Sequence, residues 1–156
     1  MHLFDVDLPD RKERYRESAS MAHGAQPVVV DTAIGRLGLS ICYDVRFPEL
    51  YRRLTDDGAV TFSIPAAFTS VTGAAHWHVL LRARAIENLA YVIAPGQFGQ
   101  HPNGRKTYGH SLIVDPWGTV LAEQASGEGI VVAALDLALP AKLRREFPAL
   151  QHRRLK

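Results

Sequence analysis

The chain is organised around one stretch, Arg36-Leu-Gly-Leu-Ser-Ile-Cys-Tyr-Asp-Val-Arg-Phe-Pro-Glu-Leu50. Its apolar run from Leu37 to Ile41 predicts a buried strand. Pro48 suits the first turn of a helix, because the N–H that proline lacks has no partner there anyway. The only cysteine, Cys42, therefore lies on a predicted strand-to-helix turn. Helix N-terminal N–H groups at such a turn can favour a thiolate and hold a nearby oxyanion.

Two interpretations of this cysteine compete. A lone cysteine on an apolar strand is more often an inert core residue. The polar residues at fixed offsets from it favour a chemical role instead: Tyr43, Asp44, Arg46 and Glu49. A charged cluster beside the end of a buried strand is hard to explain by packing alone.

Length and charge exclude several classes of protein. The 156 residues suffice for one domain, which would bury roughly 70% of its unfolded surface. A net charge of +2 is too small to indicate a nucleic-acid partner. No apolar stretch approaches the ~18 residues that span a bilayer, and residues 1–7 lack a signal-peptide pattern. One cysteine cannot form an internal disulfide, so we expect a reducing, cytoplasmic location and no membrane association.

The order of predicted elements indicates an α/β protein with a mixed sheet. A helix is predicted over 77–90, because Trp77, Leu81, Ala85 and Leu89 recur every four residues. The end of a buried strand is expected in 2–9, and loops in 10–25 and 96–106. The remaining predictions are strands at 28–31, 59–64, 91–94 and 129–136, a hairpin of 108–115 and 118–123, and helices at 48–53 and 141–147.

Several motifs occur in a fixed order along almost the whole chain. They are Ile41–Leu50, Pro65-Ala-Ala-Phe-Thr69, Thr72-Gly-Ala-Ala-His-Trp77, Arg82-Ala-Arg-Ala-Ile-Glu-Asn88, Tyr108-Gly-His-Ser111 and Asp115-Pro-Trp-Gly118. This series resembles the nitrilase superfamily, the carbon–nitrogen hydrolases. The ending, residues 143–154, resembles the branch that hydrolyses deaminated glutathione.

The resemblance implies a nitrilase-like α-β-β-α sandwich, commonly dimerised through helices. It also implies a Glu–Lys–Cys set that hydrolyses non-peptide amides or nitriles without a metal or organic cofactor. Cys42 matches the nucleophile, and Glu17 matches an accessory glutamate. The family's lysine would fall just before Met1, and its general-base glutamate further upstream. We therefore expect residues 1–156 to be the C-terminal portion of a single hydrolase domain, inactive alone.

The implied chemistry assigns roles to residues around the turn. Cys42 would attack the carbonyl of a small carboxylic acid amide and form a thioester, while the Tyr43 backbone N–H donates to the oxyanion. Arg46 has two interpretations of about equal weight. It would clamp a substrate carboxylate, or it would only stiffen the turn by an ion pair with Asp44 or Glu49.

Other candidates are weaker. Loops beyond strand ends commonly line a pocket, so Phe68, Thr69 and Thr72 are candidate substrate contacts, although they would also suit an ordinary loop. Histidines 76 and 78 would point apart on a helix, and no metal site is predicted. A structural ion pair explains Arg84 and Glu87, Arg82 stays an open candidate, and His110 is expected to be a core histidine.

Two rival functions remain. A different cysteine hydrolase would pair Cys42 with His76, His78 or His110. A non-catalytic assembly module would need a partner or a second copy, because loss of an N-terminal half would uncover an apolar sheet face, and large apolar patches promote association. We therefore expect a homo-oligomer.

Overall fold

The structure, a computed structural model, describes residues 1–8 and 13–155. The strands are β1 (Asp5–Leu8), β2 (Glu13–Arg16), β3 (Val28–Thr32), β4 (Gly35–Leu39), β5 (Thr61–Ser63), β6 (Tyr91–Ala94), β7 (Phe98–Gln100), β8 (Lys106–Tyr108), β9 (Ser111–Val114) and β10 (Val120–Gln124). The α-helices are α1 (Pro48–Asp56), α2 (Ser70–Asn88) and α3 (Leu139–Glu146). The 3-10 helices among the described residues are η2 (Glu17–Ala19), η3 (Cys42–Arg46) and η4 (Ala149–His152).

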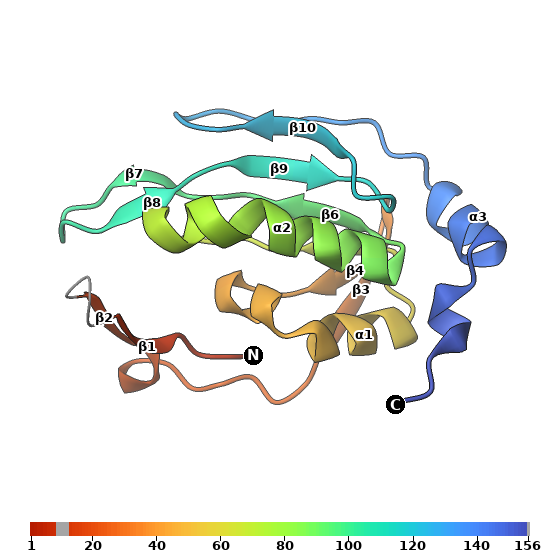
Figure 1. The fold of residues 1–156 in the computed structure, drawn as a ribbon, viewed down its shortest axis with the longest axis horizontal. Helices are drawn as coiled ribbons and strands as arrows, with labels where there is room; N and C mark the ends of the chain where they lie inside the picture. Colours follow the sequence, from red (N-terminus) through yellow and green to blue (C-terminus); the bar gives the residue numbers. More distant parts are fainter. Residues whose placement is uncertain (9–12, 156) are drawn as a thin grey trace.

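Six strands form the central sheet in the order β10-β9-β6-β5-β4-β3. The inner strands β4, β5 and β6 run parallel, and the outer ones pair antiparallel. Parallel neighbours need a crossover connection, which α1 supplies between β4 and β5 and α2 between β5 and β6. Figure 1 shows both helices on the same face of the sheet, so the core lies between them and the strands.

Helix α2 confirms the predicted periodicity. Trp77, Leu81, Ala85 and the C-cap residue Leu89 are each at most 2% exposed. The helix begins earlier than expected, because the side chain of Thr69 caps its first turn. Its buried face packs on β6 and β9.

Close packing of α1 on the sheet depends on Gly38. A Cβ at this position would lie 3.0 Å from the Phe62 ring and 3.1 Å from Leu54 of α1. Real Cβ atoms rarely approach neighbours this closely, so a larger residue would push the helix and sheet apart. Phe62 and Leu54 are both fully buried.

The opposite face of β3 and β4 carries exposed apolar side chains. Neighbouring residues in a strand point to opposite faces, so Leu39 faces away from the helices, together with its cross-strand neighbour Val28 and with Val30. These three residues are between 38% and 47% exposed, and Ile41 is 66% exposed. The prediction of a fully buried strand over Leu37–Ile41 is therefore wrong, because the described residues cover only one face.

The mixed α/β class is confirmed. The described residues contribute one α layer and one β layer of the expected α-β-β-α arrangement. Two two-stranded ribbons, β1–β2 and β7–β8, stand apart from the central sheet. Within the described ranges, no helix combines the length and apolar content needed to cross a bilayer.

The predicted strand at 129–136 is wrong. This segment forms no strand, and Ile130 and Val132 are 89% and 79% exposed. An apolar alternation yields a strand only where a neighbouring strand and a packing surface exist. The other late predictions, the hairpin around residues 115–118 and the last helix, are confirmed as β9–β10 and α3.

Two expected loops contain ribbons instead. The loop predicted for 96–106 includes β7 and pairs it with β8. In the loop predicted for 10–25, residues 10–12 lie outside the described part, and β2 and η2 follow. The expected core strand of 2–9 becomes β1, whose partner is the short polar strand β2, so it joins a surface ribbon rather than the core. Residue 9 is also outside the described part.

Candidate active site

Cys42 begins η3 directly after β4, as the strand-to-helix turn predicts. Its φ of 45° is in the left-handed region, which non-glycine residues rarely occupy. The Cys42 N–H donates to the Pro65 carbonyl oxygen at 2.8 Å, and the Ser40 N–H donates to Ser63 at 3.1 Å. The turn is thus tied to the end of β5. Backbone held in a strained region by its surroundings is common at functional sites.

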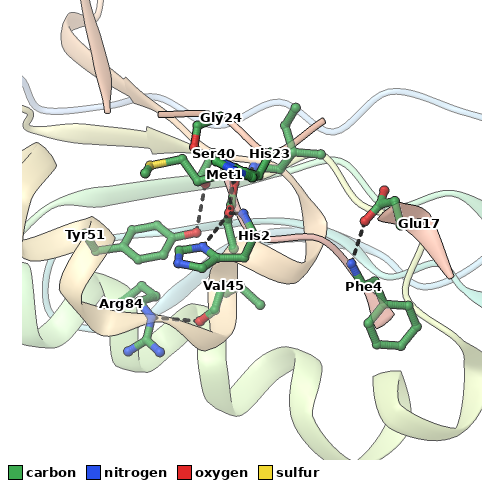
Figure 2. Close-up of polar contacts among 12 residues, drawn as sticks. Met1, His2, Phe4, Glu17, His23, Gly24, Ser40, Val45, Tyr51 and Arg84 are labelled. Atoms are coloured by element: carbon green, nitrogen blue, oxygen red, sulfur yellow. Dashed lines mark hydrogen bonds and ion pairs between the residues drawn. The ribbon is translucent and has the colours of Figure 1, made fainter. Parts of the chain in front are cut away.

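Helix α2 holds this turn through Arg84, which is 5% exposed. Its Nε donates to the Val45 carbonyl oxygen at 2.9 Å, a contact visible in Figure 2. Its Nη1 lies 2.8 Å from Glu87 Oε1, so the predicted ion pair is confirmed. The guanidinium also lies 5.4 Å from the Tyr51 ring centre. Arg84 is a structural anchor of η3.

Asp44 fixes the entry to the turn. Its carboxylate accepts from the backbone N–H groups of His2 and Ile41, at 2.8 and 2.9 Å, and from the Met1 amino group. Burial opposes its ionisation, but these hydrogen bonds and the one from the His2 side chain together lower the pKa of Asp44. With these donors around it, Asp44 forms no ion pair with Arg46.

A cavity of about 250 Å³, partly open to solvent, lies beside Cys42. The predicted site residues Cys42, Tyr43, Arg46, Phe68, Thr69 and Thr72 all line it, whereas Glu17 does not. Phe4, Ala67 and Arg105 complete the lining. The fold therefore gathers residues from η3, the loop after β5 and the start of α2.

The Arg46 guanidinium is not paired with a carboxylate in the part of the chain that the structure describes. Its Nη1 lies 3.3 Å from His76 Nδ1, and it sits 5.2 Å from the Phe68 ring centre and 6.0 Å from that of Tyr43. The alternative of an ion pair with Asp44 or Glu49 is not formed. The positive charge of Arg46 is therefore available to bind an anion in the cavity that Phe68 and Tyr43 line.

The loop after β5 is ordered by the cap of α2. Thr69 Oγ1 accepts from the Thr72 N–H at 3.3 Å, and the two hydroxyl oxygens lie 2.9 Å apart. Phe68 packs on Trp77 with ring centres 4.8 Å apart. This packing and capping hold the three candidate substrate contacts, Phe68, Thr69 and Thr72, in place.

Glu17 does not line the cavity but supports a residue that does. Its Oε2 accepts from the Phe4 N–H at 2.7 Å (Figure 2). The Phe4 ring contacts Tyr43, with ring centres 5.0 Å apart. Glu17 is thereby placed to position the wall of the cavity. The N–H of Tyr43 lies in the first turn of η3, where helical N–H groups have no partner within the helix.

The Cys42 thiol has a raised pKa. Burial is the main cause, and it outweighs a hydrogen bond with the Ala67 backbone and the nearby charge of Arg105, both of which lower the pKa. Glu17 adds to the rise, and Arg46 opposes it. The expectation that the helix N-terminus favours a thiolate is not met here, because loss of water around the sulfur dominates.

Arg105 is a cavity residue that the sequence reasoning missed. It lies between β7 and β8, in a segment interpreted only as a polar loop. Its Nη2 donates to the Ala67 carbonyl oxygen at 2.6 Å, and its guanidinium lies 5.1 Å from the Tyr15 ring centre. Its buried Nε has no hydrogen-bond partner among the described residues. No local signal identifies Arg105, because only the β7–β8 ribbon brings it to Cys42.

The histidines occupy other places. His76 and His78 point apart as expected, toward Arg46 and Glu123 respectively. His110 is not a core histidine: its side chain is 24% exposed and contacts Glu123. Within residues 1–8 and 13–155 no histidine lines the Cys42 cavity, which argues against a Cys–His pair.

Comparisons with known proteins identify the family. A family model for carbon–nitrogen hydrolases matches residues 1–145. A deaminated glutathione amidase of Synechocystis is 51% identical over 155 residues, covering 98% of this chain and 57% of that protein. The human deaminated glutathione amidase is 47% identical over 153 residues, which cover 98% of this chain and 47% of the human protein.

A solved structure has the same fold. The crystal structure of the C. elegans NitFhit protein matches with a TM-score of 0.92 and 50% sequence identity, covering 99% of this chain and 37% of that one. The chain spans about half the length of the curated relatives it matches. Because the family model covers nearly all of its residues, the chain belongs to the carbon–nitrogen hydrolase family, within the nitrilase superfamily.

Proposed function

We propose that this chain is the nucleophile-bearing part of an amidohydrolase that cleaves the C–N bond of a small carboxylic acid amide. One observation carries the proposal: Cys42 stands at a strained strand-to-helix turn beside a cavity that two arginines line. Packing alone gives no reason to place a thiol, a guanidinium without a carboxylate partner and backbone N–H groups around one opening.

The chemistry proceeds through a thioester. The Cys42 sulfur forms a bond to the amide carbonyl carbon, and the carbonyl oxygen becomes an oxyanion that the Tyr43 N–H stabilises. The C–N bond then breaks, and the nitrogen leaves as ammonia after taking up the proton that the Cys42 thiol loses. Water next attacks the thioester carbon, the C–S bond breaks, and the acid and the thiol are released. Metal and organic cofactors have no part in these steps.

Arg46 and Arg105 indicate an anionic substrate. Both guanidinium groups border the cavity, and a guanidinium binds a carboxylate through two parallel hydrogen bonds. The relatives named deaminated glutathione amidase support an amide of this acidic kind. We assign Arg46 to clamp the substrate carboxylate, Phe68 and Thr72 to contact the substrate, and Glu17 to hold Phe4 in position.

The isolated chain should not turn over an amide. Among the described residues, no lysine, histidine or acidic residue lines the cavity, and the Glu17 carboxylate is engaged by the Phe4 N–H. Burial raises the pKa of Cys42, which disfavours the thiolate that must attack the amide. The resemblance places the general base and the lysine outside these residues, so neither ammonia release nor thioester hydrolysis is assisted.

A second candidate function is that of an assembly module. The exposed apolar face of β3–β4 and two exposed residues of α2, Val79 and Ile86, favour association. We propose that the chain forms a homo-oligomer in solution. Light scattering should then give a dimer or a higher species, and a monodisperse monomer would contradict this.

An activated ester tests the amidohydrolase proposal. A nitrophenyl ester of a dicarboxylic acid carries the same acyl group as an acidic amide, but its leaving group departs without a proton. We expect one equivalent of nitrophenolate per chain and then a stall, since thioester hydrolysis lacks a base. The corresponding amide should release no ammonia above the blank.

The variant Cys42→Ala is the control. A burst of equal size from this variant would show that Cys42 is not the nucleophile. The assembly module would then be the remaining candidate function. Continuous release of nitrophenolate or ammonia that depends on Cys42 would support Cys42 as the nucleophile. The same result would contradict the expectation that the isolated chain is inactive.

A further inference from the structure

Three potential metal ligands meet on the molecule away from the Cys42 cavity. His78 Nε2 lies 2.8 Å from Glu123 Oε1, and His110 Nδ1 lies 2.5 Å from the same oxygen. One ligand atom from each of the three side chains lies within 4.8 Å of the others. None of the three lines the Cys42 cavity, so this cluster has no part in the proposed amide chemistry.

We propose that His78, His110 and Glu123 form a binding site for a divalent first-row transition-metal ion, of which Zn²⁺ is the natural probe. Two imidazoles and one carboxylate form a donor set that Zn²⁺ accepts, with a fourth position open to water. The side chains are 24–32% exposed, so an ion can reach them from solvent. The sequence prediction of no metal site rested on the divergence of His76 and His78 on one helix and on the lack of a carboxylate or cysteine pattern near them, whereas His110 and Glu123 come from distant parts of the sequence.

The ligands come from three elements that are fixed relative to one another. His78 is on α2, His110 is in the connection from β8 to β9, and Glu123 is on β10. The His110 carbonyl oxygen accepts from Trp77 Nε1 at 2.8 Å. The His110 N–H donates to the Ala125 carbonyl oxygen at 3.1 Å. The backbone of His110 is thereby tied both to the helix and to the far end of β10.

His110 also has an unusual backbone. Its φ of 54° is in the left-handed region, after Gly109 at 78°. This conformation turns the imidazole toward Glu123 and stacks it on Tyr108, with ring centres 4.0 Å apart. Packing in a core does not require a histidine to adopt a left-handed backbone conformation. A metal ligand, in contrast, must hold its ring nitrogen in one direction.

Only a small adjustment is needed to accept an ion. With bonds of about 2.0–2.2 Å, tetrahedral Zn²⁺ separates its ligand atoms by about 3.3 Å. The two N···O distances of 2.8 and 2.5 Å would therefore open by about 0.5 and about 0.8 Å. Rotation of the partly exposed Glu123 side chain supplies that change without backbone movement. The bound ion would join α2 to the edge strand β10.

The test is calorimetric titration of the purified chain with Zn²⁺. We expect one equivalent to bind and the thermal midpoint to rise. His78→Gln, Glu123→Gln and His110→Asn should each weaken binding by more than ~100-fold, because even losing an outer partner of a ligand costs roughly 10–100-fold. Asparagine is chosen at His110 because it tolerates the left-handed backbone. His76→Gln, two residues away on α2, is the matched control and should bind as the wild type does.

Two results would overturn the site. One is the absence of binding by the folded chain, and the other is equal affinity in His78→Gln and His76→Gln, which would indicate adventitious surface histidines. If a variant loses its circular dichroism spectrum, the visible absorption of Co²⁺ on the wild-type chain decides. Strong bands of a low-coordinate imidazole complex support the site, and the weak bands of an octahedral hydrated ion contradict it.

Discussion

Replacement of Arg46 by glutamine should change which electrophile Cys42 prefers. Among residues 1–8 and 13–155, the guanidinium contacts the His76 ring nitrogen and the rings of Phe68 and Tyr43 and pairs with no carboxylate. In the proposed site it faces the carboxylate of the reactant. Iodoacetate carries such a carboxylate and iodoacetamide does not, so the ratio of their alkylation rates measures this contact.

The expected size follows from the exposure of the site. A hydrogen bond to a charged group contributes about 1.5–3 kcal/mol, and solvent screening moves a half-buried pair to the lower end. A loss of about 1.4 kcal/mol of interaction free energy in the transition state lowers the reaction rate about tenfold. Arg46→Gln should therefore lower the iodoacetate-to-iodoacetamide ratio about tenfold. Stability should fall by less than about 1 kcal/mol, because a partly exposed cation–π contact contributes only about 0.5–1 kcal/mol.

The assay compares second-order alkylation rates of the two reagents, each divided by its rate with free cysteine. Any change in the Cys42 pKa affects both reagents alike and cancels in the ratio. Arg53→Gln is the control, because Arg53 pairs with Asp57 on the exposed side of α1. Arg46→Lys should retain part of the preference, since it keeps the charge and loses the planar fork. Equal slowing of both reagents by Arg46→Gln would refute the clamp.

Three further predictions concern the turn itself. Alkylation of Cys42 by iodoacetamide should rise with pH to a midpoint above that of free cysteine in the same assay, because burial raises the thiol pKa and only the thiolate reacts; a midpoint at or below that of free cysteine would contradict this. Because φ at Cys42 is positive, Cys42→Gly should be about 1 kcal/mol more stable to urea than Cys42→Ala, and equal stability would show that the turn is unstrained. Arg84→Ala should destabilise the chain by about 3 kcal/mol, the lower end for a broken buried pair because Glu87 is 27% exposed; a change under 1 kcal/mol in urea unfolding would mean that Arg84 does not anchor Val45.

The parts of the fold that local chemistry determines could be predicted. The spacing of Trp77, Leu81 and Ala85 predicted one face of a helix, and all three side chains are buried in the structure. Pro48 marked the start of α1, and the Asp115–Gly118 turn marked the β9–β10 hairpin. In each case a short stretch of sequence carries the whole signal.

Features that depend on distant partners could not be predicted. Ile130 and Val132 have the alternation of a strand, but no neighbouring strand pairs with their segment in the described structure. The ribbon β7–β8 lies in a polar stretch that gives no periodic signal. The exposure of Leu39 likewise depends on which layer covers its face, and a strand's own sequence does not specify that.

The candidate site shows the same division. The motif around Cys42 indicated Arg46, and the position of Phe68 and Thr72 beyond a predicted strand end indicated these two residues. The fold brings all three to the same cavity as Cys42. Arg105 could not be found, because its loop carries no motif. The raised pKa of the thiol was also missed, since burial is a property of the folded chain.

The central claim is that the Cys42 sulfur is the attacking atom, and the position of the acyl group after the ester burst tests it most directly. Peptide mass spectrometry of the stalled chain should find one dicarboxylic acyl group, attached to the peptide that contains Cys42. Its release by hydroxylamine should restore the free thiol. Acyl groups on lysines instead, or the same extent of acylation in Cys42→Ala, would contradict the account.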